Sequence, residues 1–543
     1  MKKKAGNKTY KLWTAAALST IMVTSLLSGC GGGDKGGSSS GSSKAELSDS
    51  VEAKENTYPL NSDDTFTYWG VMRPNIAPNF TNMGDTHIGK QWQKQTGVKI
   101  KFEHPVTGQD TEQFNLILAD GNYPDLWDYD WRSFPGGPAK ALDDGVILEL
   151  NDLINEHCPN LKKYLKDHPE VARTIKTDDG RYYSFPSLRD VYASYLGPLV
   201  RSDWLKKCNL EVPETIDEWH DVLTAFKDQM GASAPFTASN KSDTFFAYAY
   251  GVQNGFFLDD GKVVFGPAKK EYKEYMKTMH QWYDEGLIDP DYFASGEDET
   301  TAKMTTGRSG VTSAWAASGM MNYIPIGQET EPEYDLTATK NPVLKKGETP
   351  EYGYIENPYY YGGLAIGATC KDPVTAAEVL DYGYGEEGHM MFNFGEDGVS
   401  YTMENDNPVY TDVVWKNENG WPVSQAIADY ILAYSFGPFV QDSRYQEQYL
   451  YMDQAKEAIK TWADTNAKEH LMPEITRTSD ESSEYATIMN DIGTYVGEMS
   501  AKFIMGTEDI DSGFDKYLDT LNQMGLEQAV EINTAAYERY QKR

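Results

Sequence analysis

Hydrophobic and polar residues alternate in short stretches near the start of the chain's body and follow helical spacing between them. The stretch "TFTYWGV" alternates and is rich in strand-favouring residues, so it predicts a β-strand. "GDTHIGKQWQKQTGVKIKF" then predicts a helix that ends at Gly97 and a strand with Val98, Ile100 and Phe102 on one face. "DTEQFNLILADGNYPDLWDYDW" predicts a second helix, ending at Gly121, and a third strand. This alternation of strands and helices indicates an α/β layered structure.

Amphipathic helices are the main pattern in the later part of the chain. In "PETIDEWHDVLTAF", Thr215 and Glu218 predict a capping box at the start of a helix. The apolar face predicted for that helix consists of Trp219, Val222, Leu223 and Phe226. "YKEYMKTMHQWYDEGLIDPDYF" predicts another amphipathic helix, which ends at Gly286. Residues 442–543 are mostly helical in pattern and show no repeat of fixed period.

The N-terminal residues 1–29 have the layout of a secretory signal peptide. Five lysines precede an uncharged and mainly apolar run from Leu12 to Leu27. No other stretch of the sequence is long and apolar enough to span a bilayer. The chain is therefore expected to work outside the cell or at its surface.

Composition excludes some classes of function and favours another. The chain has 49 Lys and Arg against 83 Asp and Glu, which argues against a nucleic-acid partner because such a partner needs a basic surface. Its 37 tyrosines offer flat apolar faces with a polar edge, which suit carbohydrate or peptide binding, although many rings must fill cores. The four cysteines form no CxxC pair and the eight histidines have no ligand spacing, so no metal and no cofactor are predicted.

The residues "LSGC", from Leu27 to Cys30, resemble the bacterial lipobox. The resemblance implies that a diacylglycerol is attached to the Cys30 thiol and that the peptide is cut before this residue. Residues 31–58 hold mostly Gly, Ser and charged residues, so residues 30–58 are predicted to form a disordered tether. The alternative is an ordinary secretory signal with an incidental cysteine.

Segments in order along the body resemble the extracellular solute-binding proteins of ABC transporters. The similarity is to the maltose-binding-like family, and within it to the larger lipoproteins of Gram-positive bacteria. The segments that carry it are "WQKQTGVKIKF", "FNLILADGNYPDLW", "GRYYSFP", "RSDWLKKCNLEVPETIDEW", "EGLIDPDYF", "GRSGVTSAW" and "YGGLAIGATCKDPVTAAEVLDYGYGEEGHMMFNFGEDGVSY". The resemblance implies two α/β lobes joined by hinge strands, as in periplasmic binding proteins, with an extra helical C-terminal region. The expected first lobe is 59–190 plus 316–372, and the expected second lobe is 191–315 plus 373–543.

The same resemblance implies a function and its partners. The protein is expected to be a monomer on the extracellular face of the cell membrane, held by the lipid on Cys30. It would capture an oligosaccharide, a uronic-acid-containing one among the options, in a cleft between the lobes. It would then deliver the ligand to permease subunits, and no catalysis is implied. Some larger relatives carry a calcium loop where this chain has "MGASAPFTASN", which lacks clustered carboxylates, so no structural calcium is expected there.

Candidate ligand contacts are sought in loops that follow predicted strands, where α/β sheets bind ligands. After the first strand, "WGVMRPN" offers Trp69 and Arg73; Arg73 would either donate to a hydroxyl or carboxylate or form a surface salt bridge. After the third strand, "DLWDYDWRSF" offers Tyr129, Asp130 and Trp131, which match positions that contact sugar in a relative. Some aromatic residues of this loop must be core residues.

The hinge and the second lobe supply further candidates. Arg189 would either reach a ligand charge or pair with an acid at the hinge, and together with Arg73 it would suit an anionic sugar. Phe246 lies where relatives have a stacking aromatic, although a core position is the alternative. Trp315, in "SGVTSAWAASG", matches the tryptophan that stacks on sugar in the family. Tyr360 and Tyr361 precede a strand that returns to the hinge, and one of them is expected to face the cleft.

Two other classes of function compete with solute capture. A secreted carbohydrate-active hydrolase also needs a cleft, aromatic residues and paired carboxylates, but no GxSxG, HExxH or P-loop pattern occurs here. A surface lipoprotein that captures a peptide or another polar solute would share the anchor and tether, but it should lack the ordered set of lobe and hinge segments.

Overall fold

The computed structural model describes residues 47–48, 51–60, 62–239, 245–433 and 437–543. The chain divides into two units, Met1–Ser43 and Lys44–Arg543. Cys30 and the signal-peptide region lie outside the described residues. All of the elements below belong to the second unit.

The first lobe is built on a mixed β-sheet. Six described strands lie in the order β13-β4-β10-β3-β1-β2, and β10 is antiparallel to both of its neighbours while the other pairs are parallel. The strands are β1 (Thr65–Trp69), β2 (Lys99–Glu103), β3 (Leu126–Asp128), β4 (Phe185–Arg189), β10 (Tyr359–Ile366) and β13 (Phe439–Gln441). The helices of this lobe are α1 (His87–Thr96), α2 (Asp110–Asp120), α3 (Gly137–Asp143), α4 (Asn151–His157), α5 (Pro159–Asp167), α6 (Pro169–Thr174), α13 (Pro373–Asp381), α14 (Glu386–Phe394), α15 (Asp412–Trp415), α16 (Val423–Tyr430) and α17 (Ser443–Tyr449).

The unit β1–α1–β2 shows why the sequence folds in this way. Thr86 caps α1 by accepting a hydrogen bond from the Gly89 backbone, and the helix ends at Gly97, whose φ of 75° favours glycine. Ile100 and Phe102 of β2 face the core while their neighbours face solvent. The predicted helix, its end at Gly97 and the buried face of the second strand are confirmed.

The second lobe has its own sheet of three described strands, β8 (Val311–Trp315), β5 (Leu196–Arg201) and β9 (Leu336–Ala338), with β5 antiparallel to both neighbours. Its helices are α7 (Ser202–Cys208), α8 (Ile216–Met230), α9 (Phe245–Tyr248), α10 (Lys270–Asp284), α11 (Glu297–Thr305), α12 (Met321–Gln328), α18 (Asp453–Ala463) and α19 (Ala467–His470). Thr215 and Glu218 form the predicted capping box, and all four residues of the predicted apolar face of α8 are buried. A hairpin of β6 (Phe256–Asp259) and β7 (Lys262–Phe265) belongs to this lobe. A second hairpin, β11 (Tyr401–Glu404) with β12 (Asn407–Tyr410), belongs to the first lobe.

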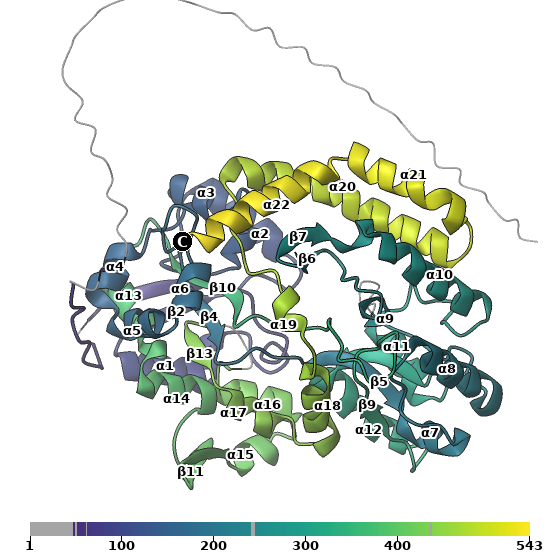
Figure 1. Cartoon of the computed structure of the whole chain (residues 1–543). Helices are drawn as coiled ribbons and strands as arrows, with labels where there is room; N and C mark the ends of the chain where they lie inside the picture. The colour runs from purple at the N-terminus through teal and green to yellow at the C-terminus, as the bar shows by residue number, and fades with distance from the viewer. Residues whose placement is uncertain (1–46, 49–50, 61, 240–244, 434–436) are drawn as a thin grey trace, which may run out of the picture. The chain divides into compact units, whose positions relative to one another are not determined.

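Three C-terminal helices complete the fold: α20 (Ser479–Ile504), α21 (Ile510–Gln523) and α22 (Leu526–Gln541). The middle and end of α20 and most of α21 pack into the core of the second lobe. α22 runs beside α20, and the start of α20 meets α3 of the first lobe (Figure 1). The extra helical C-terminal region expected from the sequence is thus present, and it spans both lobes.

One carboxylate of the first lobe ties down the end of this C-terminal region. Asp178 accepts hydrogen bonds from Arg539 Nε at 2.5 Å, from Thr476 Oγ1 at 3.3 Å and from the Arg543 guanidinium. Arg543 also donates to the Lys176 carbonyl oxygen at 2.7 Å, and its side chain is 3% exposed. The two lobes are therefore joined here as well as through the segments that link their sheets.

Three boundaries predicted from the sequence differ from the structure. The first concerns the tether, because residues 51–58 lie against the first lobe. The Lys54 amide donates to the Glu156 carbonyl oxygen, and the Tyr58 hydroxyl donates to the Glu378 carbonyl oxygen at 2.6 Å. Tyr58 also packs edge-on against Tyr382. A tyrosine with an apolar site and a hydrogen-bond acceptor is enough to fix a segment that composition alone reads as disordered.

The second difference concerns residues 373–449, which the sequence analysis assigns to the second lobe. α13 packs on β10 and α4, α14 packs on β13, and β13 itself is a strand of the first sheet. These residues belong to the first lobe because their apolar faces join the core around that sheet. The segment that returns to the second lobe begins with α18, whose neighbours are β9 and β5.

The third difference concerns the expected first-lobe segment 316–372. Its first part holds α12 and β9, and β9 pairs with β5 in the sheet of the second lobe. Only its later part, with β10, belongs to the first sheet.

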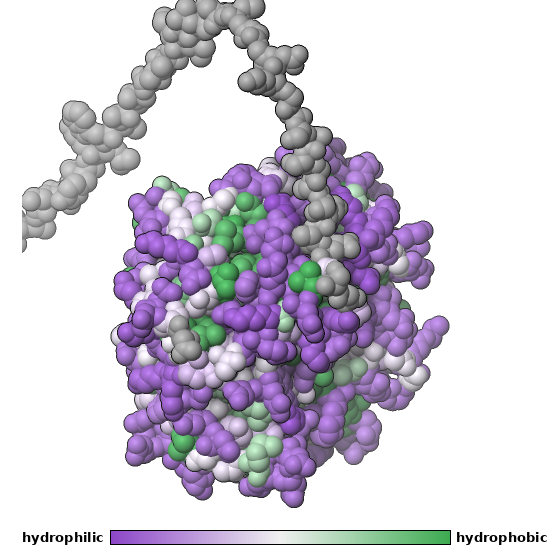
Figure 2. Space-filling view, turned by 90° about the vertical axis from the view of Figure 1, so that its left-hand side faces the viewer, coloured by the Kyte–Doolittle hydropathy of each residue, from purple (hydrophilic) through white to green (hydrophobic). Residues whose placement is uncertain are grey.

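The surface of the body agrees with its acidic composition. The face in Figure 2 is mostly hydrophilic, with separate and small hydrophobic areas. No helix within the described ranges is long and apolar enough to cross a membrane.

Asp381 is a buried carboxylate that holds the start of α5. Its Oδ1 accepts a hydrogen bond from the Leu161 amide at 2.8 Å, and its Oδ2 accepts one from the Asn160 amide at 3.2 Å. Burial raises the pKa of Asp381 to about 7, although these hydrogen bonds oppose the shift. The folded protein therefore loses stability as the pH rises from the ordinary carboxyl pKa towards 7, because the buried group must ionise.

We predict that Asp381→Ala lowers the free energy of unfolding by about 1–3 kcal/mol near pH 5, since two amides of α5 lose their acceptor. The difference from the wild type should narrow as the pH is raised to about 8, because only the wild type carries the cost of ionising Asp381. Urea unfolding across this pH range measures both effects. Asp412→Ala, at a carboxylate that is 73% exposed, is the control and should follow the wild type. A difference that stays constant or widens with pH would contradict the prediction.

Candidate functional site

Five strands of the first sheet run in one direction, and four of them, β1, β3, β4 and β13, carry the residues considered below; we call the edge at which they end the strand-end edge. β1, β3, β4 and β13 share one direction because β10, which lies between β3 and β4, is antiparallel to both. The strands end at Trp69, Asp128, Arg189 and Gln441. Ligands of open α/β sheets bind beyond the carboxyl ends of the strands. The polar side chains at this edge are therefore the candidate site.

The first ion pair at the strand-end edge joins the loop after β1 to the end of β3. Arg73 Nη2 lies 3.3 Å from Asp128 Oδ2, which also accepts a 2.7 Å hydrogen bond from the Tyr68 hydroxyl. The Asp128 side chain is 2% exposed and that of Arg73 is 18% exposed. The second carboxylate oxygen, Oδ1, is buried and has no hydrogen-bond partner among the described residues. Asp128 thus holds Arg73 and keeps spare acceptor capacity.

The second ion pair lies in the segment directly after β3. Arg132 binds both oxygens of Asp130, at 2.8 and 2.9 Å, and its Nη1 lies 3.1 Å from Glu474 Oε2 in the segment before α20. The same guanidinium lies over the ring of Tyr359, 5.1 Å from its centre. The Tyr359 hydroxyl is 2.8 Å from that of Tyr183. Burial raises the pKa of Tyr183 to about 12 and that of Tyr359 further, so both hydroxyls remain protonated.

A continuous set of contacts leads from β4 to the second sheet. Arg189 forms an ion pair with Glu356 and donates from Nε to Gln441 Oε1 at 3.0 Å. Glu356 also accepts a 2.6 Å hydrogen bond from the Tyr354 hydroxyl. The Tyr354 ring meets Trp315 edge-on, with 5.5 Å between ring centres. Trp315 ends β8 and is 36% exposed, so it presents an apolar face next to this polar chain.

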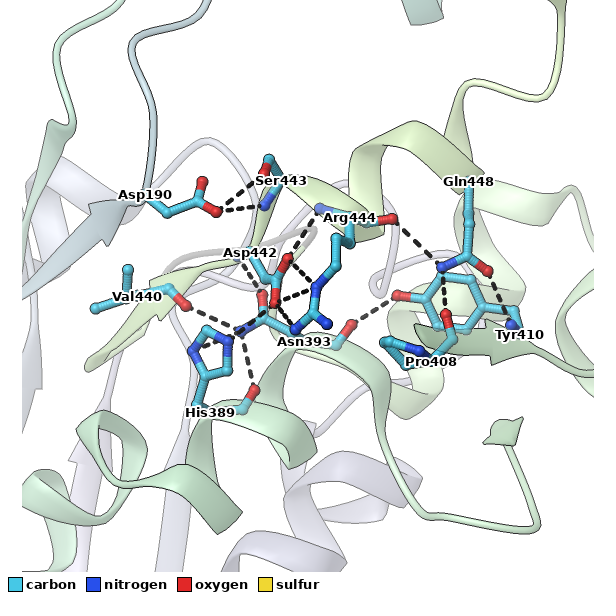
Figure 3. Close-up of polar contacts among 10 residues, drawn as sticks. All are labelled: Asp190, His389, Asn393, Pro408, Tyr410, Val440, Asp442, Ser443, Arg444 and Gln448. Atoms are coloured by element: carbon cyan, nitrogen blue, oxygen red, sulfur yellow. Dashed lines mark hydrogen bonds and ion pairs between the residues drawn. The ribbon is translucent and has the colours of Figure 1, made fainter. Parts of the chain in front are cut away.

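The end of β13 carries the densest polar network (Figure 3). Asp442 accepts hydrogen bonds from the Arg444 guanidinium and from His389, whose Nε2 is 3.1 Å away. Asp190, which follows β4, accepts a 2.9 Å hydrogen bond from Ser443 Oγ. The amide of Asn393 donates to the Val440 carbonyl oxygen, so α14 fixes the strand end from behind. Burial opposes ionisation of Asp442, but its hydrogen bonds to His389 and Arg444 outweigh burial and hold the pKa well below its ordinary value.

A small cavity of about 100 Å³ lies where the linking segments meet α6 and α22. Tyr192, Asn357 and Tyr359 line it from the segments that join the two sheets, and Tyr540 lines it from α22. Lys468 Nζ lies over the ring of Tyr192, 4.1 Å from its centre. The cavity is too small for a sugar ring with its hydroxyls, whose sites are several times larger.

Three of the predicted ligand contacts are buried in cores. Trp69 and Trp131 are 5% and 0% exposed and belong to an aromatic cluster under the strand-end edge, in which both meet Trp127 edge-on. Phe246 is 1% exposed and packs against Trp219 and Trp282. Trp69 and Trp131 thus support the loops of the strand-end edge, and Phe246 belongs to the core of the second lobe, because rings this large gain more from mutual packing than from exposure.

The other predicted contacts are better placed. Arg73, Asp130 and Arg189 lie at the strand-end edge with partly exposed side chains. Trp315 is exposed and is linked to Arg189 through Tyr354 and Glu356. Tyr129 is half-buried, stacked 4.1 Å from Phe114, and desolvation raises its pKa. Tyr360 and Tyr361 lie in β10, and their side chains are outside the described part of the structure. Ligand contact by all these residues stays a prediction.

The sequence analysis missed the partners of the predicted residues. These partners are Arg132, Tyr354, Glu356 and Glu474, of which Arg132 stands in the stretch "DLWDYDWRSF". The available signal was the pairing of charges: an arginine beside a sheet end needs a carboxylate, and Asp130 stands two residues from Arg132. Nothing in the sequence indicates the role of Glu474, since its partner Arg132 is 342 positions away along the chain.

Metal ligands and reactive cysteines play no visible part in this geometry. No group of three or more His, Cys, Asp or Glu side chains that would hold a metal occurs among the described residues. Cys158, Cys208 and Cys370 are free thiols, and desolvation by burial raises the pKa of each. A raised thiol pKa lowers reactivity, which fits structural roles.

Comparison with known proteins gives one consistent family. The family model described as bacterial extracellular solute-binding protein matches residues 81–390. The chain is 25% identical over 530 residues to the fructooligosaccharide ABC transporter substrate-binding protein FusA of Streptococcus pneumoniae, covering 89% of this chain and 92% of that protein. It is also 25% identical over 233 residues to the polygalacturonan/rhamnogalacturonan-binding protein YtcQ of Bacillus subtilis, covering 41% and 45% of the two chains.

Solved structures of the same kind share the fold. Alginate-binding protein AlgQ2, in a calcium-free crystal structure, superposes with a TM-score of 0.71 at 27% identity, covering 89% of this chain and all of that one. FusA of S. pneumoniae in complex with kestose superposes with a TM-score of 0.69 at 23% identity over 88% of this chain and all of that one. The two-lobed α/β fold expected from the sequence is confirmed.

We predict that Asp442→Asn lowers the free energy of unfolding by about 1.5–3 kcal/mol at pH 7, because hydrogen bonds to a charged group are lost. A depressed carboxyl pKa contributes stability above the ordinary pKa, and this contribution disappears as the pH falls through the pKa of the folded state. The difference between variant and wild type should therefore shrink below about pH 4. Urea unfolding at several pH values tests this, with Asp453→Asn on the exposed start of α18 as the control. A pH-independent difference would show that the ionised state of Asp442 is not what stabilises the strand end.

Proposed function

Because the chain belongs to the family of bacterial extracellular solute-binding proteins, we propose that it captures an oligosaccharide at the strand-end edge, between its two lobes. It is a solute-binding component of an ABC importer, and the captured ligand passes to the permease subunits. The observation that carries the carbohydrate assignment is the alignment with a fructooligosaccharide-binding protein over nearly the full length of both chains. Two further relatives are named for polygalacturonan or alginate binding.

The geometry of the strand-end edge suits a sugar. Sugars offer apolar C–H faces and many hydroxyls, so they need an exposed aromatic ring next to hydrogen-bonding groups. Trp315 is exposed to 36% at the end of β8 and is held by Tyr354, which itself donates to Glu356. Asp130 and Arg189, whose side chains are partly exposed, lie at the strand ends of the first lobe. An oligosaccharide would therefore contact both lobes.

Contact of the ligand with both lobes would couple binding to closure of the lobes. A ligand that binds only when the lobes are close together shifts the equilibrium towards the closed form by its differential affinity. The linking segments that would bend carry Arg189, Tyr192 and Glu356, which also form the site. Ligand binding and lobe movement would thus act on the same residues, and the closed form would be the one presented to the permease.

The anchor belongs to the same proposal. A diacylglycerol on Cys30 would keep the body on the extracellular face of the membrane, since two acyl chains give stable attachment. Leu47 already packs against the first lobe, so the free tether would comprise residues 30–46. At ~5–6 Å × √n this segment would reach about 20–25 Å. The body would act close to the membrane, where its permease lies.

We predict that Trp315→Ala weakens binding of the cognate oligosaccharide at least about tenfold, because the exposed apolar face is lost. The measurement is isothermal titration with a panel of glycans, supported by ligand-induced thermal shifts taken relative to each variant's own melting temperature. Trp415→Ala, which removes a tryptophan beside the β11–β12 hairpin, is the matched control and should bind as the wild type does. Release of reducing sugar from any glycan would instead support the hydrolase alternative.

We predict that Cys30→Ser releases the protein from the membrane fraction of a Gram-positive host into the medium. The reason is that the thiol that would carry the lipid is absent, whereas the signal peptide remains. Fractionation with detection of incorporated labelled palmitate measures the effect. Ser28→Ala, two residues earlier, leaves the thiol in place and serves as the control. Membrane attachment that survives Cys30→Ser would contradict the anchor.

A further inference from the structure

We infer that the ligand of the strand-end edge is an uncharged oligosaccharide, because every arginine described at this edge is already held by a carboxylate of the chain itself. The inference rests on the proposed function and narrows its ligand class. Binding of a uronic acid needs a guanidinium or ammonium group that can pair with the ligand carboxylate. The contacts of each cation at the edge therefore decide whether that cation is available to a ligand carboxylate.

Arg73, the first arginine expected to meet an anionic sugar, is paired with Asp128 at 3.3 Å. Asp128 is 2% exposed and also accepts a hydrogen bond from Tyr68, so it cannot turn away to release Arg73. A ligand carboxylate that took Arg73 would leave Asp128 buried without its cation, and such unpairing of a buried charge is strongly unfavourable.

Arg189, the second such arginine, is held in the same way. Its guanidinium forms an ion pair with Glu356 and donates to Gln441, and the two charged side chains are only 12% and 15% exposed. Tyr354 fixes the other oxygen of Glu356 at 2.6 Å. The pair is thus braced on both sides, and an incoming carboxylate would compete with a carboxylate that is already positioned.

The two other arginines of the edge repeat the arrangement. Arg132 binds Asp130 with two hydrogen bonds and Glu474 with a third contact, and Arg444 binds Asp442. Lys468, the nearby cation of the small cavity, lies over the ring of Tyr192 on the side of α6 and α22. Pairing is therefore a property of the whole edge and not of one residue.

The charge balance at the edge points the same way. Four arginines face six carboxylates: Asp128, Asp130, Asp190, Glu356, Asp442 and Glu474. The chain as a whole, these side chains included, carries a formal net charge of −34. A polyuronate would approach a surface of its own sign, at which each of these four arginines already has a carboxylate partner. A neutral sugar meets no such repulsion, and its hydroxyls can donate to partly exposed carboxylates of the edge such as Asp130.

The test compares neutral and acidic oligosaccharides of equal length. The neutral probes are nystose, maltotetraose, cellotetraose and mannotetraose, and the acidic probes are tetragalacturonate and tetramannuronate. We expect one or more neutral probes to bind at least about tenfold more tightly than either acidic probe, with a Kd that changes less than about twofold when salt is raised, because no ion pair forms with the ligand.

The outcomes separate this inference from the function on which it rests. Tighter binding of tetragalacturonate or tetramannuronate, lost in Arg73→Gln or Arg189→Gln, would overturn the inference and leave oligosaccharide capture intact. Failure of every probe, neutral and acidic, in titration and in thermal shift would overturn both.

A second experiment tests the pairing itself. Glu356→Gln keeps the hydrogen bond to Tyr354 possible but leaves Arg189 without its counter-charge, so affinity for tetragalacturonate should rise about tenfold. Asp190→Asn is the matched control: it removes a carboxylate at the same edge that accepts from Ser443 and holds no arginine. Thermal melting verifies that both variants fold. Affinity for tetragalacturonate that does not rise in Glu356→Gln, or rises equally in the control, would show that pairing of Arg189 is not what excludes acidic sugars.

Discussion

The direction of the strands in the first sheet is the constraint on which the rest of the site depends. β10 runs antiparallel between β3 and β4, so β1, β3, β4 and β13 all end at one edge although they come from residues 65 to 441. Polar groups stand at the ends of β3, β4 and β13 and in the loop after β1, and they meet because these strands end at the same edge. Arginine and carboxylate side chains that are distant in sequence thus become paired, and their pairing both stabilises the edge and determines which ligands it can accept.

The aromatic residues of the protein divide into supports and contacts according to how much surface they can bury. Trp69, Trp127 and Trp131 bury most apolar surface by packing on one another, so they form a rigid aromatic layer beneath the edge. Trp315 stands at the end of β8, where the chain turns into the next helix and leaves one face open. A sugar-binding site uses both kinds of aromatic residue: the buried layer fixes the loops, and the exposed ring contacts the ligand.

Local patterns in the sequence were enough to predict the elements, the capping box of α8 and the buried face of β2, because these depend on neighbours within a few residues. The resemblance of ordered segments supplied the two-lobed architecture. The buried state of Trp131 and Phe246 could not be derived, since a ring's surroundings come from remote segments. The partners of Arg73 and Arg189 were missed for the same reason, and so was Tyr58, whose acceptor is 320 positions away.

Asp178 gives the two lobes a point of attachment besides the segments that link their sheets. This carboxylate lies in the turn between α6 and β4, and Arg539 and Arg543 bring to it the end of a helix that packs on the second lobe. The Arg132–Glu474 ion pair and the contact of α20 with α3 join the same C-terminal region to the first lobe. A displacement that separates the lobes at this side has to break charged hydrogen bonds, and the C-terminal region therefore restrains how the lobes can move.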